Sequence, residues 1–192
     1  MNTLADIYLP EIHFSEHHEC VVNCASEKIA PLVVELDFSG SWIIRMLFAL
    51  RGMPAHTMTL KGLDSSRFIT LTKNPHELAL GLIGQFWRPS GNLQQFTPAE
   101  FKPFQESGFC KAIWTFTLTE INANTTQVQT DTRIYCTDKE SLRKFSRYWF
   151  LIRPFSGLIR IEILRSIKSK AEHSKINVTS VRCECPPALH CI

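Results

Sequence analysis

Alternating apolar and polar residues predict a long β-hairpin in the second half of the chain. Residues 108–121 place Trp114 and Phe116 on one face of a strand, although Ile113 breaks the polar pattern on the other. After an Asn-Ala-Asn turn, residues 126–137 alternate in the same way. The two stretches therefore predict a pair of antiparallel strands.

Four further stretches have the composition or alternation of strands, at residues 17–25, 68–72, 76–87 and 93–96. In the third of them Leu80, Leu82 and Phe86 fall on one face. Gly81 and Gly84 lie in the same stretch and permit a bulge or a bend, which a strongly curved sheet requires. The pattern therefore predicts a curved antiparallel sheet.

Two short helices are predicted after the first strand. Ser26 is a suitable N-cap for the first, and Pro31 inside it favours a short or kinked helix. Ser41 opens the second, which Gly52 closes. The apolar residues of this second helix lie on most of its sides. That distribution favours burial, with contact to lipid as the alternative.

A long helix is predicted over residues 139–172, with Asp138 as part of its cap. Phe145 and Trp149 belong to an apolar stripe at helical spacing. Pro154 interrupts the stripe and predicts a kink or a short break. This helix would lie across the sheet and complete an α+β fold.

The composition is that of one globular domain, with 192 residues of which 44% are hydrophobic and 20% charged. A net charge of only +3 gives little support for nucleic acid as a partner. The charge is concentrated, because residues 139–170 contain nine Lys or Arg against two Glu, a local excess of seven. Either this is a solvated helix face, or it attracts an anionic membrane surface or an acidic ligand.

Seven cysteines form no paired framework, which favours buried thiols in a reducing compartment. The first residues lack the pattern of a signal peptide, and no stretch has the length of a membrane span, so we expect a cytoplasmic protein. His18 and Cys20 share a strand face, and the tail holds Cys183, Cys185 and Cys191. The first group has no second ligand pair at a recognisable spacing. The tail, with its weak Cys-x-Cys signal, is either a metal or redox cluster or a disordered segment, and its prolines and terminal position favour the second. Neither a metal nor a cofactor is therefore expected.

The chain resembles the START-like, or SRPBCC, superfamily and within it an uncharacterised bacterial branch. The stretches that carry the resemblance are LFALRGMP (47–54), ELALGLIGQFWRPSGNL (77–93), GFCKAIWTF (108–116), TRIYCTD (132–138) and FSRYWFLIRPFSGLIRIEILRSIK (145–168). The resemblance implies the helix-grip fold, a curved antiparallel sheet wrapped around a long C-terminal helix. We expect one domain over residues 1–173 and a flexible cysteine-containing tail over residues 174–192.

The superfamily also implies an apolar cavity between the concave face of the sheet and the terminal helix. Thr130 and Thr132 fit a cavity because a solid core normally excludes unpaired hydroxyls, although they could also bond to each other or to the backbone. Arg88 or Arg133 could hold a carboxylate or phosphate group, or simply pair with a neighbouring side chain. The residues expected to line the cavity are Leu80, Leu82, Phe86, Trp87, Arg88, Trp114, Phe116, Thr130, Thr132, Arg133, Tyr135, Phe145 and Trp149.

Three functions fit this expectation. The first is an intracellular binding protein for a hydrophobic or amphipathic small molecule. The second is a cyclase or aromatase-type enzyme, for which no catalytic motif is found and Tyr135 or a threonine would be the polar group. The third is a membrane-associated lipid or quinone chaperone that uses the basic helix and the apolar segment at residues 42–50. The sequence specifies no ligand, oligomeric state or pathway.

Overall fold

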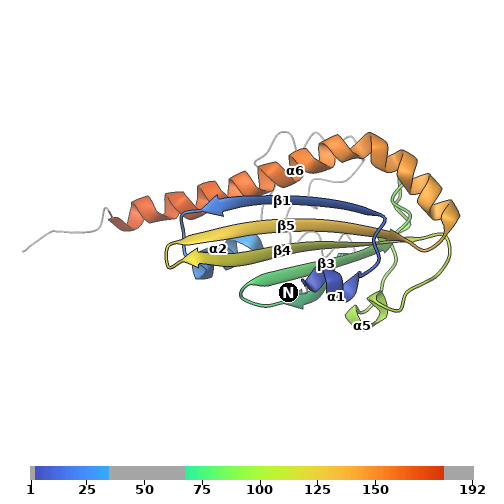
Figure 1. Cartoon of the computed structure of the whole chain (residues 1–192), viewed down its shortest axis with the longest axis horizontal. Coiled ribbons are helices and arrows are strands. Elements are labelled where there is room, and N and C mark those ends of the chain that lie inside the picture. Colours follow the sequence, from blue (N-terminus) through green and yellow to red (C-terminus); the bar gives the residue numbers. More distant parts are fainter. Residues whose placement is uncertain (1–2, 35–67, 180–192) are drawn as a thin grey trace, which may run out of the picture.

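The computed structural model describes residues 3–34 and 68–179, and for residues 174–179 the backbone alone. The described residues form one antiparallel sheet of five strands in the order β1-β5-β4-β3-β2, with α6 lying along it (Figure 1). The elements are α1 (Leu4–Tyr8), β1 (Phe14–Val22), α2 (Ser26–Val34), β2 (Ile69–Lys73), β3 (Glu77–Gly84), α5 (Pro98–Phe101), β4 (Cys110–Asn122), β5 (Thr125–Cys136) and α6 (Lys139–Thr179). The predicted α+β helix-grip architecture is confirmed. The helix predicted at residues 41–52 lies outside the described residues.

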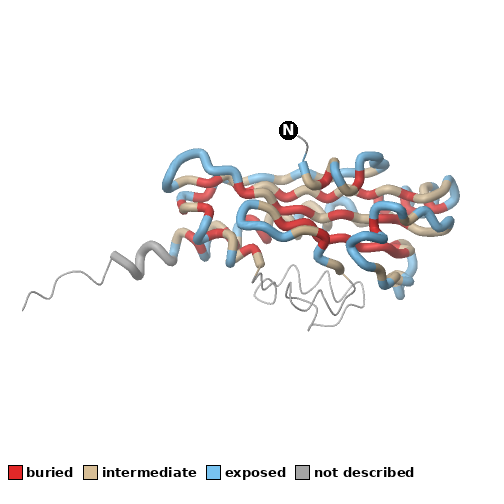
Figure 2. Tube along the Cα trace, turned by 90° about the horizontal axis from the view of Figure 1, so that it is seen from below, coloured by how far each residue is buried: buried red, intermediate tan, exposed pale blue. Residues whose placement is uncertain are grey.

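The predicted hairpin is formed by β4 and β5, near the middle of the sheet. Trp114 pairs with Thr132 and Phe116 with Thr130, so aromatic and hydroxyl side chains share the face that α6 covers, the inner face. Burial alternates residue by residue along β5, as a strand period of two requires. Figure 2 shows the buried positions running through the strands, while the turns at the ends of the sheet are exposed.

The outer face of the sheet is also covered, by α1, α5 and the segments beside them. Ile83 and Ile113 are fully buried there, in one cluster with Leu9 and Phe101. This burial explains why Ile113 breaks the polar pattern of its strand, since the part of the outer face around it does not meet water. The sequence did not predict α1, whose five residues are too few to show helical periodicity.

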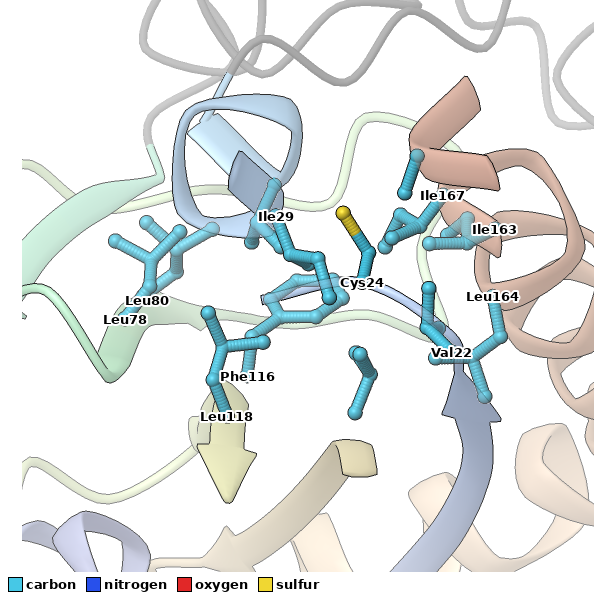
Figure 3. Close-up of a cluster of buried hydrophobic side chains, with 13 residues drawn as sticks. Val22, Cys24, Ile29, Leu78, Leu80, Phe116, Leu118, Ile163, Leu164 and Ile167 are labelled. Atoms are coloured by element: carbon cyan, nitrogen blue, oxygen red, sulfur yellow. The ribbon is translucent and has the colours of Figure 1, made fainter. Parts of the chain in front are cut away.

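Part of the inner face carries a solid core. Ile29 of α2 and Ile163 and Ile167 of α6 point into the same interior as Phe116 of β4 (Figure 3). The complete cluster is Val22, Cys24, Ile29, Val33, Leu78, Leu80, Phe116, Leu118, Val128, Ile163, Leu164, Ile167 and Ala171. The C-terminal half of α6 is thus anchored in close-packed side chains, and the space that remains lies under its N-terminal half.

The helix α6 begins where the sequence predicts. Asp138 Oδ1 accepts hydrogen bonds from the backbone N–H groups of Glu140 and Ser141, both at 2.8 Å, which confirms the predicted cap. The hydrogen bonds from Ser141, Gly108 and Glu140 lower the pKa of Asp138 to about 2. The helix continues past Pro154 without the predicted break. Figure 1 shows it curving over one end of the sheet.

Two predictions about the strands differ from the structure. The strand β3 ends at Gly84 because a tight turn follows, in which the Gln85 N–H donates to the Gly91 carbonyl at 2.6 Å, and residues 93–96 form no strand. One register irregularity lies between Glu120 and Asn122 of β4, and another lies between Thr70 and Thr72 of β2. Leu71, between them, packs over Gly81 of β3, where a Cβ would come within 3.0 Å of both its terminal carbons. The glycine therefore accommodates a bulge on its partner strand.

Candidate functional site

A cavity of about 210 Å³ lies between the inner face of the sheet and the N-terminal half of α6. Its wall is mostly apolar, with hydroxyl and guanidinium groups at one place. The described residues that line it are Phe68, Leu82, Phe86, Ala112, Trp114, Thr132, Ile134, Phe145, Tyr148, Trp149, Ile152, Phe155, Ser156, Ile159 and Arg160, together with Ile113, whose side chain is buried in the cluster on the outer face. The space therefore suits a compact ligand that is largely hydrophobic.

One side of the cavity is built from aromatic rings in mutual contact. Phe145 lies at the centre, with ring centroids 5.0 Å from Phe14, 5.8 Å from Trp149 and 6.1 Å from Phe86. Phe145 is 1% exposed and Trp149 8%. Tilted, stacked and edge-to-face contacts at these distances hold rings in place, so this side presents a fixed apolar surface to a ligand.

The other side of the cavity ends in a polar group centred on Arg160. The Arg160 Nε and Nη2 atoms both donate to Thr132 Oγ1, at 2.9 Å and 2.6 Å. The Nη1 atom donates to the Ser156 carbonyl at 3.0 Å and to Ser156 Oγ at 2.8 Å. Ser156 Oγ in turn donates to Glu16 Oε2 at 2.7 Å. We call Glu16, Thr132, Ser156 and Arg160 the polar end of the cavity.

Charge at the polar end is balanced within the protein. Glu16 Oε2 lies 3.7 Å from Arg160 Nη1, and the two side chains are 7% and 12% exposed. Burial lowers the pKa of Arg160 to about 10, and the nearby Glu16 opposes that shift. The guanidinium carbon also lies 5.6 Å from the centroid of the Trp114 ring. Arg160 therefore stays charged at neutral pH. The negative charge that balances it is the carboxylate of Glu16 on strand β1.

Six of the residues predicted from the sequence do line the cavity: Leu82, Phe86, Trp114, Thr132, Phe145 and Trp149. Three more, Leu80, Phe116 and Thr130, lie on the same face of the sheet but outside the cavity. Leu80 and Phe116 belong to the solid core, and Thr130 Oγ1 accepts a hydrogen bond from Trp114 Nε1 at 2.7 Å. The partner of the Thr130 hydroxyl is thus the Trp114 side chain, whereas the sequence suggested the backbone or another threonine.

Arg133 and Tyr135 lie on the outer face of the sheet, away from the cavity. Arg133 Nη1 donates to Asp6 Oδ1 of α1 at 2.5 Å, and this bond is the main cause that lowers the pKa of Asp6 to about 2. Tyr135 stacks on His13, with ring centroids 5.0 Å apart. Since neighbouring residues of a strand point to opposite faces, neither side chain can share a cavity with Thr132.

Trp87 and Arg88 follow the end of β3 and do not line the cavity. Arg88 is exposed in the turn after Gln85. Trp87 is half-buried and packs against the cluster that contains Phe86 and Phe145. The cation that the structure places beside the cavity is thus Arg160, which the sequence analysis did not single out.

Arg160 and Ser156 could have been recognised from helical spacing. They continue the inward stripe of Phe145, Trp149 and Ile152 at intervals of four residues, so a cation falls on an apolar face. The inward position of Glu16 could not be recognised from the sequence pattern, because the first strand was predicted to begin at residue 17 and in fact begins at Phe14. A strand that starts at Phe14 puts Glu16 on the inner face.

Buried thiols lie behind the aromatic side of the cavity. Cys110 and Cys136 pair across β4 and β5 with their sulfur atoms 2.9 Å apart. The contact with Cys136 and burial raise the pKa of the Cys110 thiol. These two cysteines are buried free thiols, as the sequence indicated.

Within residues 3–34 and 68–179, no group of three or more His, Cys, Asp or Glu side chains is arranged to hold a metal ion. The tail cysteines Cys183, Cys185 and Cys191 lie outside the described residues. None of the described helices combines the length and apolar character that crossing a membrane requires.

No protein-family model matches the chain, and no curated protein matches it. Among solved structures it is similar to a point mutant of norcoclaurine synthase from Thalictrum flavum bound to a transition-state analogue, with 9% identity, a TM-score of 0.41, and coverage of 84% of this chain and 96% of that one. It is also similar to the same plant's norcoclaurine synthase bound to dopamine and hydroxybenzaldehyde, with 8% identity, a TM-score of 0.39, and coverage of 96% and 97%.

A third similar structure is the Zhui aromatase/cyclase from a Streptomyces species, with 10% identity, a TM-score of 0.30, and coverage of 83% and 93%. At these identities and TM-scores the similarities carry no argument about activity. The strand order and the helix that lies along the inner face define the fold. The chain is an α+β domain with the helix-grip arrangement that the START-like resemblance implied.

Proposed function

We propose that this protein binds a compact hydrophobic or amphipathic small molecule between the sheet and α6. The observation that carries the proposal is the cavity of about 210 Å³, apolar over most of its wall and polar at one end. Ligand sites in proteins commonly combine an apolar lining with a few placed polar groups. Native mass spectrometry of protein purified from its source tests the proposal, with a co-purified small molecule as the expected result.

Filling the cavity should abolish binding without unfolding the domain. Ala112 lines the cavity from β4 and is only partly buried, so a leucine there would occupy ligand space. We expect Ala112→Leu to weaken binding of isopropenylnaphthalene, an apolar probe, by at least about tenfold. Isothermal titration calorimetry measures the affinity, and circular dichroism should show an unchanged melting profile.

The matched control for this variant is Ala123→Leu, which adds the same atoms at an exposed position in the turn between β4 and β5. The control should bind the probe like the unaltered protein. Equal affinity in Ala112→Leu would contradict the proposal, because the ligand would then lie elsewhere.

An enzyme of the cyclase or aromatase type would use the same cavity. It would need a polar group beside the reacting atoms, for which the sequence suggested Tyr135 or a threonine. Tyr135 lies on the outer face, in the cluster with Ile113. Thr132 does line the cavity, where its Oγ1 accepts two hydrogen bonds from Arg160. Glu16 is held by Ser156 and Arg160. A binding function is therefore the one that we propose for the cavity.

A second candidate function, peripheral contact with an anionic membrane, rests on the outer side of α6. Phe150 is 87% exposed and Leu151 68% exposed, which is unusual for large apolar side chains. The first part of the helix, residues 139–153, contains five Lys or Arg and one Glu. Apolar side chains flanked by cations are typical of helices that lie at the surface of an anionic bilayer.

Vesicle sedimentation tests this second function. We expect the protein to pellet with vesicles of phosphatidylcholine and phosphatidylserine, less at high salt, and the double variant Phe150→Glu/Leu151→Glu to stay in solution. The matched control is Ile121→Glu, which is 55% exposed in β4 at the turn into β5. A dimer that the double variant dissociates, with no vesicle binding, would show instead that this face contacts a second copy.

A further inference from the structure

Two hydrogen-bond donors at the polar end of the cavity have no acceptor among the described residues. Thr132 Oγ1 already accepts two hydrogen bonds from Arg160, so its own hydrogen must point away from the guanidinium. Arg160 Nη2 carries two hydrogens, and one of them is used on Thr132. Among the described residues, neither the Thr132 hydroxyl hydrogen nor the second Nη2 hydrogen has an acceptor.

The Thr132 hydroxyl is the donor that can serve a ligand, because the unused Nη2 hydrogen of Arg160 points away from Thr132. Thr132 Oγ1 and Arg160 Nη2 are 2.6 Å apart, and both residues line the cavity. Thr132 is 6% exposed, so bulk water cannot satisfy its hydroxyl freely. An acceptor oxygen in the cavity can take the Thr132 hydroxyl hydrogen. Water can hold that position in an empty cavity, and a ligand oxygen can reproduce its hydrogen bond.

The charge of the polar end selects the kind of acceptor. Arg160 is already compensated by Glu16, at 3.7 Å. A carboxylate or phosphate would therefore add an uncompensated negative charge next to a buried carboxylate, which is costly away from water. A carbonyl oxygen accepts a hydrogen bond from the Thr132 hydroxyl and brings no charge. The protein's own ion pair thus disfavours the anionic ligand groups that an arginine would otherwise attract.

We infer that the polar end of the cavity binds the neutral carbonyl oxygen of an otherwise apolar ligand, such as an aromatic ketone or a quinone. The inference rests on the proposed binding function and adds the chemical class of the ligand. Thr132 supplies the hydroxyl donor, and Arg160 orients it by donating two hydrogen bonds to Thr132 Oγ1. Glu16 acts through Arg160 as a positioning residue that keeps the site neutral.

Three derivatives of naphthalene test this inference by calorimetry. Acetonaphthone carries a carbonyl, isopropenylnaphthalene has the same shape without the oxygen, and naphthoate carries a charge. We expect acetonaphthone to bind most tightly and naphthoate most weakly. Thr132→Val should lower the affinity for acetonaphthone about tenfold and change that for isopropenylnaphthalene by less than about twofold.

Thr132→Ser keeps the hydroxyl and should restore the preference for acetonaphthone, which a merely structural role of the side chain would not do. Thr119→Val, on the exposed part of β4, is the matched control. Tight binding of naphthoate, or equal binding of the ketone and the hydrocarbon, would overturn the inference while the binding function stands. Failure of all three probes to bind the unaltered protein would overturn both.

Discussion

Replacing Glu16 with leucine should lower the free energy of unfolding by about 3–5 kcal/mol, because the change leaves a buried cation without its partner. Arg160 would keep its bonds to Thr132 and Ser156, but Ser156 would lose the carboxylate that accepts its hydrogen. The side chains of Glu16 and Arg160 are 7% and 12% exposed, so water screens the loss only weakly. Chemical denaturation measures the change.

A double-mutant cycle separates the ion pair from the rest of the packing. Arg160→Met removes the cation and keeps much of the side-chain volume. We expect the double variant Glu16→Leu/Arg160→Met to be more stable than Glu16→Leu alone, since no unpaired charge remains. Glu16→Gln, which can still accept from Ser156, should lose less stability than Glu16→Leu. Strictly additive effects of the two single changes would show that the residues do not act as a pair.

Replacing Gly84 with alanine should destabilise the protein by about 2–3 kcal/mol through overpacking. A Cβ at Gly84 would lie 2.8 Å from the Gly91 carbonyl oxygen and 2.7 Å from Leu93 Cδ2. The carbonyl cannot move aside easily, because it accepts the Gln85 N–H that closes the turn. The same turn positions Phe86, so the affinity of the cavity for apolar ligands should also fall.

Gly81→Ala is the matched comparison in the same strand. The three atoms nearest to its Cβ would all belong to the side chain of Leu71, at 3.0–3.1 Å. A flexible leucine can shift, and alanine also restricts the unfolded chain, so we expect this variant to lose less than about 1 kcal/mol. Melting curves of the two variants compare them directly. A larger loss in Gly81→Ala than in Gly84→Ala would contradict the account of the turn.

The sequence predicts the framework of this fold well, because the hairpin and α6 have long, regular patterns. Strict alternation along β5 fixes which residues share a face, and the stripe through Phe145 and Trp149 fixes which side of the helix is buried. The short helix α1 has no such pattern. The cover that it provides for the outer face is therefore visible only in the structure.

The candidate site is less predictable, because alternation shows that two sets of residues lie on opposite faces without showing which face holds a cavity. Thr132 and Arg133 were both expected at the cavity, which neighbours in a strand cannot satisfy. Once the outer face proves to be filled by α1, Arg133 has a structural partner in Asp6. The polar end also combines β1, β5 and α6, and the distances between those elements are not encoded in any local pattern.

The two halves of α6 differ in how firmly they are held. Ile163, Ile167 and Ala171 belong to the solid core, whereas Phe145, Trp149 and Ile152 border a cavity. Close-packed segments open rarely, and segments with fewer buried contacts open more often while the rest of the domain stays folded. A ligand could thus exchange through local opening of the first half of the helix, with the second half as the fixed end of a hinge.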